Sequence, residues 1–161
     1  MSCCCPTVPG GSAPTISCYY DHTKVNSQIL SQTDNWTEYI EWVDIYADPK
    51  LSLSGPPIGQ KLIQMTLSTS DVGPAGVSLY QGSYIFNGIG SIAFANGAQD
   101  EPNPNSNQVY LDMIMGGKGP FLLSKGYIAT VYSGPNDPIT SIFIYIAGCS
   151  DDGDVAPELK K

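Results

Sequence analysis

Residues 113–127, MIMGGKGPFLLSKGY, place three glycines and a proline between the apolar runs MIM and FLL. Glycine adopts backbone conformations that other residues avoid, and proline cannot donate a hydrogen bond to a sheet. Both residues therefore mark a sharp turn between two extended segments. The question that this stretch raises is whether the break is only a turn or also the rim of a binding site.

Short runs of β-branched and aromatic residues, bounded by Gly, Pro, Asn and Asp, lie on both sides of this stretch. Such runs predict β-strands. The predicted strands are residues 38–47, 61–68, 77–86, 89–95, 108–115, 126–132 and 140–147, with a weaker one at 16–20. Asn87-Gly88 joins two of them and is the strongest short hairpin signal. Residues 26–34 are expected to form only a short helical turn.

Seven or eight short strands at hairpin-like spacing predict an all-β fold, a single antiparallel barrel of seven or eight strands. We favour a closed barrel over a sandwich, because closure removes the exposed edges that apolar strands would leave. The barrel domain is expected to span 16–149. The Pro/Gly/Ser-rich residues 1–15 predict a disordered tail, and the polar residues 150–161 predict a flexible one.

Charge and composition limit the partners. The chain has 161 residues and a net charge of −8, with only seven Lys and Arg residues. This balance argues against nucleic acid and against an anionic membrane as partners. No signal peptide or membrane span is visible, so a cytoplasmic location is expected. Pairing of Cys18 with Cys149 would instead favour secretion. Cys3, Cys4 and Cys5 do not complete a metal site, and no metal or other cofactor is expected.

The alternation of side chains sorts the predicted strands into two faces, and neither face is uniformly polar. On the first strong strand, Trp42, Asp44 and Tyr46 share a face with Ile40. On later strands, Tyr80 and Tyr84 share a face with Phe86, and Tyr110 shares one with Asp112. A barrel that holds a partly polar cavity, or whose outside packs on other subunits, would explain this pattern. The expected partners are therefore a hydrophobic small molecule and further copies of the chain, with a trimer and a dimer both open.

The glycine-rich stretch resembles a signature of dirigent proteins, in which a Gly-Gly-x-Gly turn, a Phe and a Gly-Tyr pair follow a strand. Here these are Gly116, Gly117, Gly119, Phe121, Gly126 and Tyr127. A similar turn occurs in allene oxide cyclases, which share the barrel. Residues 42–45 (WVDI) and 58–60 (IGQ) resemble the first dirigent strands. Residues 77–99 look more like the compact bacterial barrels that catalyse [4+2] cyclisation.

The resemblance implies a trimeric barrel that excludes water and holds a reactive, hydrophobic intermediate in one conformation. In this family the glycines shape the turn at the barrel end, so their expected role is structural. Asp44 matches the dirigent first-strand aspartate. The candidate catalytic residues are Asp44, Tyr80 and Tyr84, and the candidate substrate-binding residues are Trp42, Tyr46, Phe86, Tyr110, Asp112, Tyr132 and Tyr145.

Each of these residues also has a structural interpretation: Asp44 as an outward or rim carboxylate, the aromatic residues as core, and Asp112 as part of a solvated face. The chain lacks a Gly-x-Ser-x-Gly elbow, a Walker loop and a dinucleotide fingerprint. Two functions remain open. The first is a cofactor-independent isomerase, cyclase or stereo-directing protein that folds a polyene, quinone methide, phenoxy radical or epoxide. The alternative is a non-catalytic barrel that binds an apolar ligand or self-assembles. A buried Asp44 facing an open cavity would favour the first, whereas an interior filled by Trp42, Tyr84 and Phe86, with wide apolar outer faces, would favour assembly.

Overall fold

The structure is a computed structural model that describes residues 14–50, 55–68, 77–100, 105 and 107–147. The predicted disordered tail 1–15 falls almost wholly outside these residues, and the predicted flexible tail 150–161 falls outside them completely. No helix in the described part of the chain is long and apolar enough to cross a membrane.

Within the described residues the fold consists of nine strands in one sheet, and every neighbouring pair is antiparallel. The strands are β1 (Ile16–Asp21), β2 (Asn26–Gln32), β3 (Trp36–Ile45), β4 (Gly59–Ser68), β5 (Val77–Phe86), β6 (Gly90–Asp100), β7 (Val109–Lys118), β8 (Gly126–Tyr132) and β9 (Ile139–Ile146). Two 3-10 turns, His22–Lys24 and Gly119–Phe121, are the only helical elements described. The predicted all-β class is confirmed.

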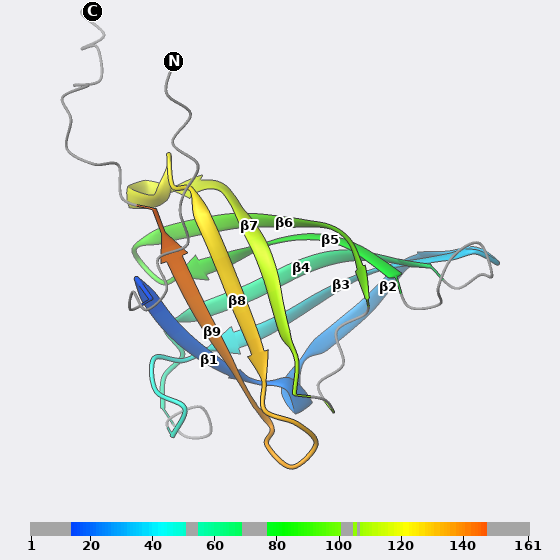
Figure 1. The fold of residues 1–161 in the computed structure, drawn as a ribbon, viewed down its shortest axis with the longest axis horizontal. Coiled ribbons are helices and arrows are strands. Elements are labelled where there is room, and N and C mark those ends of the chain that lie inside the picture. Colours follow the sequence, from blue (N-terminus) through cyan, green and yellow to red (C-terminus); the bar gives the residue numbers. More distant parts are fainter. Residues whose placement is uncertain (1–13, 51–54, 69–76, 101–104, 106, 148–161) are drawn as a thin grey trace, which may run out of the picture.

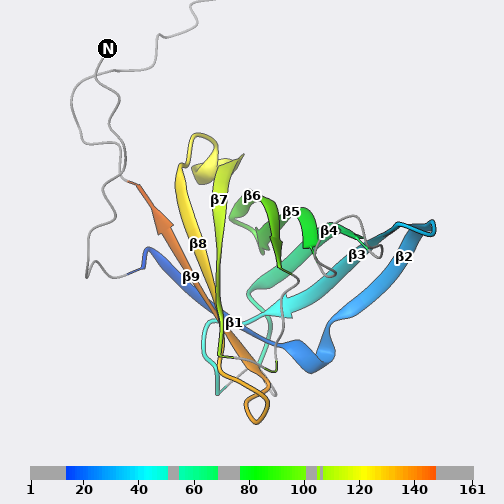
Figure 2. The same cartoon turned by 45° about the vertical axis from the view of Figure 1, so that its right-hand side comes forward.

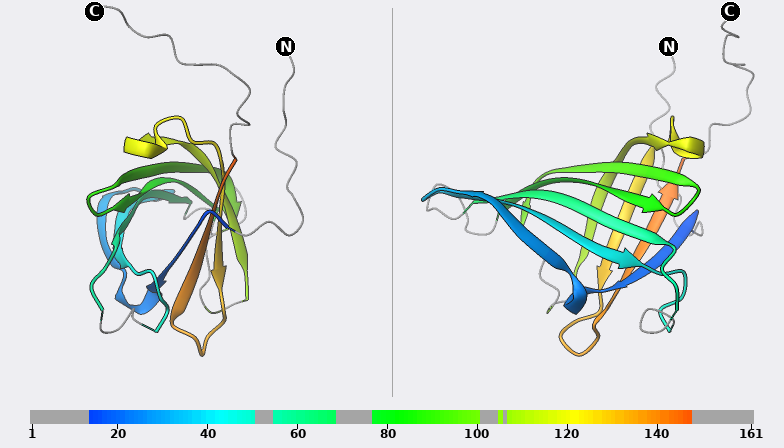
Figure 3. Two further views of the ribbon diagram at one scale, coloured as in Figure 1. Left: turned by 90° about the vertical axis from the view of Figure 1, so that its left-hand side faces the viewer. Right: turned by 180° about the vertical axis from the view of Figure 1, so that it is seen from behind.

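The sheet curls into a half-barrel instead of closing completely. Its order is β1-β9-β8-β7-β6-β5-β4-β3-β2, so β1 and β2 form its two edges. In Figure 1, β3 to β6 run across the view while β7 to β9 run steeply down it. One core cluster joins buried residues of both groups of strands, so the two halves of the sheet face each other. Figures 2 and 3 show the curl from the side and along its axis. One bridge, in which Tyr19 and Tyr46 exchange backbone hydrogen bonds of 2.9 and 2.8 Å, connects β1 to the end of β3.

The expectation of a closed barrel with seven or eight strands is therefore corrected to a nine-stranded curled half-barrel. The additional strand is β2, in the region where we expected a short helical turn. Its sequence, NSQILSQ, has no two-residue alternation, and all seven of its residues are exposed. Pairing with β3, which local sequence does not reveal, holds this strand extended.

The glycine-rich stretch that opened the sequence analysis forms the end of β7 and the turn into β8. Gly116 and Gly119 have φ angles of 123° and 68°, which residues with a side chain rarely adopt. A Cβ atom on Gly117 would lie 2.8 Å from the Cβ of Phe121, so a side chain there would clash. These glycines act in the turn itself. The predicted hairpin at Asn87-Gly88 is also present, between β5 and β6.

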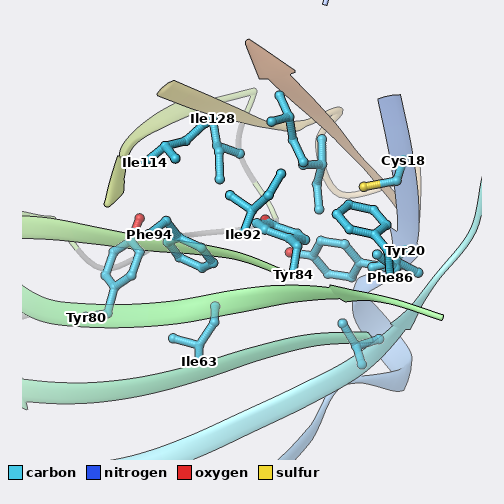
Figure 4. Packing of buried hydrophobic residues seen from close by; sticks show 14 of the residues in the cluster. Cys18, Tyr20, Ile63, Tyr80, Tyr84, Phe86, Ile92, Phe94, Ile114 and Ile128 are labelled. Atoms are coloured by element: carbon cyan, nitrogen blue, oxygen red, sulfur yellow. The ribbon is translucent and has the colours of Figure 1, made fainter. Parts of the chain in front are cut away.

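The inward face of the sheet forms the hydrophobic core. Its buried members come from β1 and from β3 to β9: Cys18, Tyr20, Val43, Ile45, Ile63, Met65, Tyr80, Tyr84, Phe86, Ile92, Phe94, Ile114, Ile128, Ile142 and Ile144. Figure 4 shows the rings of Tyr84, Phe86 and Phe94 in the space between the two halves of the sheet. Gly82 leaves room for one of them, because a Cβ there would lie 2.7 Å from Cζ of Phe94.

The opposite side of β5 to β9 is the outer face. The side chains that point outward from the middle of these strands are Leu79, Gln81, Ser83, Ile85, Ala93, Ala95, Val109, Leu111, Met113, Met115, Tyr127, Ala129, Val131, Ser141, Phe143 and Tyr145. None of them carries a formal charge at neutral pH. Lys118, at the end of β7, is exposed beyond this set.

Candidate functional site

Polar and ionisable side chains lie inside the curled sheet, among the core residues. Lys61 is on β4, where it alternates with the inward residues Ile63 and Met65 and is itself only 7 % exposed. Its Nζ lies 4.9 Å from the centre of the Tyr20 ring and 5.9 Å from that of Tyr84. The faces of aromatic rings attract cations. The amino group of Lys61 is thus held inside the fold by its contacts with two phenol rings.

Three tyrosine hydroxyls accompany this lysine. Tyr20 and Tyr132 approach each other with 3.2 Å between their hydroxyl oxygens, because β1 and β8 both pair with β9. Burial raises the pKa of Tyr20 to about 12, and it also raises the pKa values of Tyr84 and Tyr132. These phenols stay protonated at neutral pH, so they can donate hydrogen bonds.

Two buried oxygens have no hydrogen-bond partner among the described residues, Oη of Tyr84 and Oγ1 of Thr140. Thr130 and Tyr20 lie near these two atoms without reaching hydrogen-bonding geometry. A buried polar atom without a partner costs about 1–3 kcal/mol. Most such atoms in folded proteins are paired with protein or with water. The unpaired hydroxyl of Tyr84, whose ring centre lies 5.9 Å from Nζ of Lys61, therefore indicates a place where a polar group of a ligand or a water molecule binds.

Asp112 is the buried acid of the interior. It is 2 % exposed and lies on β7 between the inward residues Tyr110 and Ile114. Nδ2 of Asn96 donates to its Oδ1 over 3.1 Å, and the hydroxyl of Tyr80 also hydrogen-bonds to it. Burial raises the pKa of Asp112, while Tyr80, Asn96 and Lys61 offset part of the increase. A buried carboxyl group whose pKa is raised holds its proton more tightly than an exposed one and can serve as a general acid.

The interior is tightly filled. The rings of Tyr84 and Phe94 lie 5.1 Å apart, and those of Phe86 and Phe121 lie 5.8 Å apart. The cavity beside Lys61 has a volume of about 20 Å³, and Tyr20, Glu41 and Ile63 are among the residues that line it. This volume holds about one water molecule. Any larger ligand requires the aromatic side chains to move.

Six of the predicted site residues face this interior: Tyr80, Tyr84, Phe86, Tyr110, Asp112 and Tyr132. The rings of Tyr110 and Tyr132 meet edge to face, with centres 5.8 Å apart. The structure therefore brings the interior tyrosines together with Asp112, which is the only predicted acidic site residue on this face.

Asp44 lies on the other side of the sheet, together with Trp42 and Tyr46, and Gln60 Nε2 donates to Asp44 Oδ1 over 3.0 Å. The expectation that Asp44 faces the interior is corrected, and its outward alternative holds. Val43 and Ile45 are the buried residues of this strand, so the phase that contains Trp42, Asp44 and Tyr46 points outward. These three residues line an outer pocket of about 170 Å³ together with Asp21, Lys24, Asn26, Val43 and Gln60.

Tyr145 is also outside the core. It is stacked on Tyr127 of the neighbouring strand, with ring centres 4.6 Å apart and planes at 15°. Two interior residues, Lys61 and Tyr20, were not among the predicted site residues. The signal for Lys61 was present, because it occupies the apolar phase of KLIQM with Ile63 and Met65.

The cysteines add no reactive group to this part of the molecule. Cys18 is a fully buried free thiol, and burial raises its pKa to about 12. A thiol of this kind is unreactive at neutral pH. Cys149, its predicted partner, and Cys3, Cys4 and Cys5 lie outside the described residues. Among the residues that are described, no group of three His, Cys, Asp or Glu side chains is placed to hold a metal ion.

Comparisons with known proteins give a likeness in fold alone. No protein-family model matches the chain. No curated protein matches it either. Among solved structures, the chain is similar to a pyocyanin demethylase with a TM-score of 0.53 and 15 % sequence identity. The match covers 82 % of this chain and 98 % of the demethylase. It supports a barrel-type, all-β fold for this protein.

Proposed function

We propose that the interior cluster, defined as Lys61, Tyr20, Tyr84 and Asp112, is the site of a cofactor-independent isomerase or cyclase. Its substrate would be a hydrophobic, reactive intermediate that carries a carbonyl or phenol oxygen. The resemblance of the glycine-rich turn to dirigent proteins and allene oxide cyclases supports this proposal. The barrel-type fold is compatible with it.

In the proposed reaction the aromatic walls exclude water and fix one conformation of the substrate. Lys61 and the protonated hydroxyl of Tyr84 bind the substrate oxygen and stabilise negative charge that develops on it. Asp112 transfers the proton, because its carboxyl group lies buried among the interior tyrosines and burial raises its pKa above that of an ordinary aspartate. The acid in this scheme is Asp112, since Asp44 lies on the opposite side of the sheet.

The observation that carries the proposal is the placement of charged and unpaired polar groups in the core. Burying such groups costs free energy that an apolar core would not lose. Lys61, Asp112 and the free hydroxyl of Tyr84 converge on the interior from three different strands. A barrel that serves only as a scaffold gains nothing from this arrangement. A site that binds a polar oxygen inside an apolar environment requires it.

Fluorescence titration with 2-naphthol, an apolar phenol, tests the binding step. We expect saturable binding that weakens at least tenfold in Tyr84→Phe and Lys61→Met, with no change in the control Asp44→Asn. Native mass spectrometry of the purified protein examines the same set for a co-purifying small molecule. Unchanged binding in both interior variants, or loss of binding in Asp44→Asn, would contradict the proposed site.

Exchange of the α-protons of 2-tetralone, followed by NMR in deuterium oxide, tests the proton transfer. The wild-type protein is expected to accelerate the exchange, and Asp112→Asn to lose about 100-fold of that acceleration, a typical contribution of a general base. Binding of 2-naphthol without any acceleration would support a non-catalytic barrel that binds an apolar ligand. Absence of both binding and acceleration would support a non-catalytic barrel that self-assembles, which the filled interior favours, since only about 20 Å³ is open beside Lys61.

A further inference from the structure

The outer face carries a ridge of large apolar side chains on one strand. Val109, Leu111, Met113 and Met115 of β7 are 60, 57, 68 and 67 % exposed. Single exposed apolar residues are normal on a protein surface. Four successive outward positions of one strand are not, because a continuous apolar patch in water marks an interaction site. We call these four residues the β7 ridge.

A groove lies directly beside the β7 ridge. It has a volume of about 450 Å³, and the residues that line it include Ile40, Leu62, Ala93, Ala95 and Met115. The small side chains of Ala93 and Ala95 on β6 make the groove, and Ala95 pairs with Met113 of the ridge. One surface therefore holds a protruding apolar row and an apolar depression next to it. Two copies of such a surface can fill each other's depressions, as in the self-complementary interface of a symmetric oligomer.

Charge identifies another copy of the same chain as the partner. The protein carries a net charge of −8, so two copies repel each other over most of their surfaces. The outward side chains in the middle of β5 to β9 are uncharged. A basic partner attracted to this acidic protein would bind where acidic residues lie. A second copy of this chain is itself acidic, so it would bind where the surface carries no charge.

We propose that the chain forms a homo-oligomer through the outer face, with the β7 ridge of one copy seated in the groove of another. This assembly is independent of the proposed interior site. It is also distinct from pairing at the free edge of the sheet, where β2 exposes Ile29 and Leu30 by 60 and 49 %. The edge would add strands to the sheet, whereas the outer face packs side chains against side chains.

Light scattering after size exclusion and native mass spectrometry of the full chain test the proposal. The wild-type protein is expected to be an oligomer, and Leu111→Glu and Met113→Glu are expected to be monomers that keep the far-UV circular dichroism of the wild type. The matched control is Ile29→Glu, which places the same charge on an equally exposed apolar position of the edge strand. A monomeric wild type would overturn the proposal, as would dissociation by Ile29→Glu alone.

Methionine oxidation provides a readout that needs no substitution in the interface. Met113 and Met115 are two-thirds exposed in the single chain, so hydrogen peroxide would convert both to the sulfoxide rapidly. In the assembled wild type we expect their oxidation to be at least tenfold slower than after dilution to a concentration at which the protein is monomeric. Equal rates at both concentrations would place these side chains outside the interface and overturn the proposal.

Discussion

On β7 polar side chains face the interior and apolar ones face outward, the reverse of the usual arrangement in a sheet with one solvated face. Toward the interior the strand presents Tyr110 and the carboxyl group of Asp112, and toward the outside it presents Leu111 and Met113. Inward polar groups and outward apolar groups alternate along a single element. The buried polar groups underlie our proposal of a ligand in the interior, and the exposed apolar groups underlie our proposal of a second copy of the chain on the outside.

The largest expected effect concerns the core. Phe94 is 2 % exposed and lies against Tyr84 and Tyr80, with ring centres 5.1 and 6.3 Å away. Phe94→Ala should lower the free energy of unfolding by about 3–5 kcal/mol, because it leaves a cavity among packed rings. Urea unfolding measures this. Ile29→Ala, at a position 60 % exposed, should change it by less than about 0.5 kcal/mol. Equal costs would mean that the interior is not the packed side of the sheet.

A smaller effect is expected at Lys61. Lys61→Met removes a desolvation cost, but it also removes the contacts with the Tyr20 and Tyr84 rings and the attraction to Asp112, so the free energy of unfolding should change by less than about 1 kcal/mol. The same substitution is expected to weaken ligand binding, which would identify Lys61 as a functional residue. Thermal and urea unfolding provide the measurement, with the exposed Lys24→Met as the control. A clear loss of stability would instead make Lys61 a structural residue.

The smallest effect is a dependence of stability on pH that has opposite signs at two acids. Asp112 has a raised pKa, so the folded state holds its proton more tightly. The free energy of unfolding should therefore fall as the pH rises from the ordinary value of 3.8 through the raised pKa. For Asp21, burial raises the pKa, but the hydroxyl and amide of Thr23 lower it on balance. Its contribution is present above pH 3.8 and is lost as the pH falls through the lowered pKa.

Unfolding measured in urea at a series of pH values separates the two acids. The difference between Asp112→Asn and the wild type should increase in favour of the variant as the pH rises. For Asp21→Asn the variant should be less stable than the wild type at neutral pH, and the deficit should shrink in acid. If both differences ran in the same direction, the contrast between the buried acid of β7 and the hydrogen-bonded acid of β1 would be wrong.

The strands of this sheet could largely be predicted from the sequence. The runs 77–86 and 126–132 match β5 and β8, and the others differ from the structure at one or both ends by one to a few residues. β-Branched and aromatic residues between turn signals identified them. β2 could not be predicted in this way, because a polar edge strand is held by its neighbour and not by its own sequence. The incomplete closure is equally invisible, since it depends on the pairing of β1 with β9 and on a bridge to β3.

The candidate site was predicted in part. Tyr80 and Tyr84 share the inward face with Phe86, as the alternation indicated. The error at Asp44 arose because both faces of residues 38–47 carry aromatic and apolar side chains, so alternation could not distinguish inside from outside. Burial of Val43 and Ile45 decides the matter, and that burial depends on the rest of the sheet.

The pairing of β1 with β9 has a consequence for how the sheet is completed during folding. Each strand from β2 to β9 pairs with the strand next to it along the chain, so these strands can form one hairpin after another. β1 is different, because Ile16 is aligned with Ile144 at the other end of the described chain. Contacts between such distant residues slow folding, since a long loop must close before they form. A circular permutant that joins β9 to β1 and begins at β2 would turn this distant pairing into a local one.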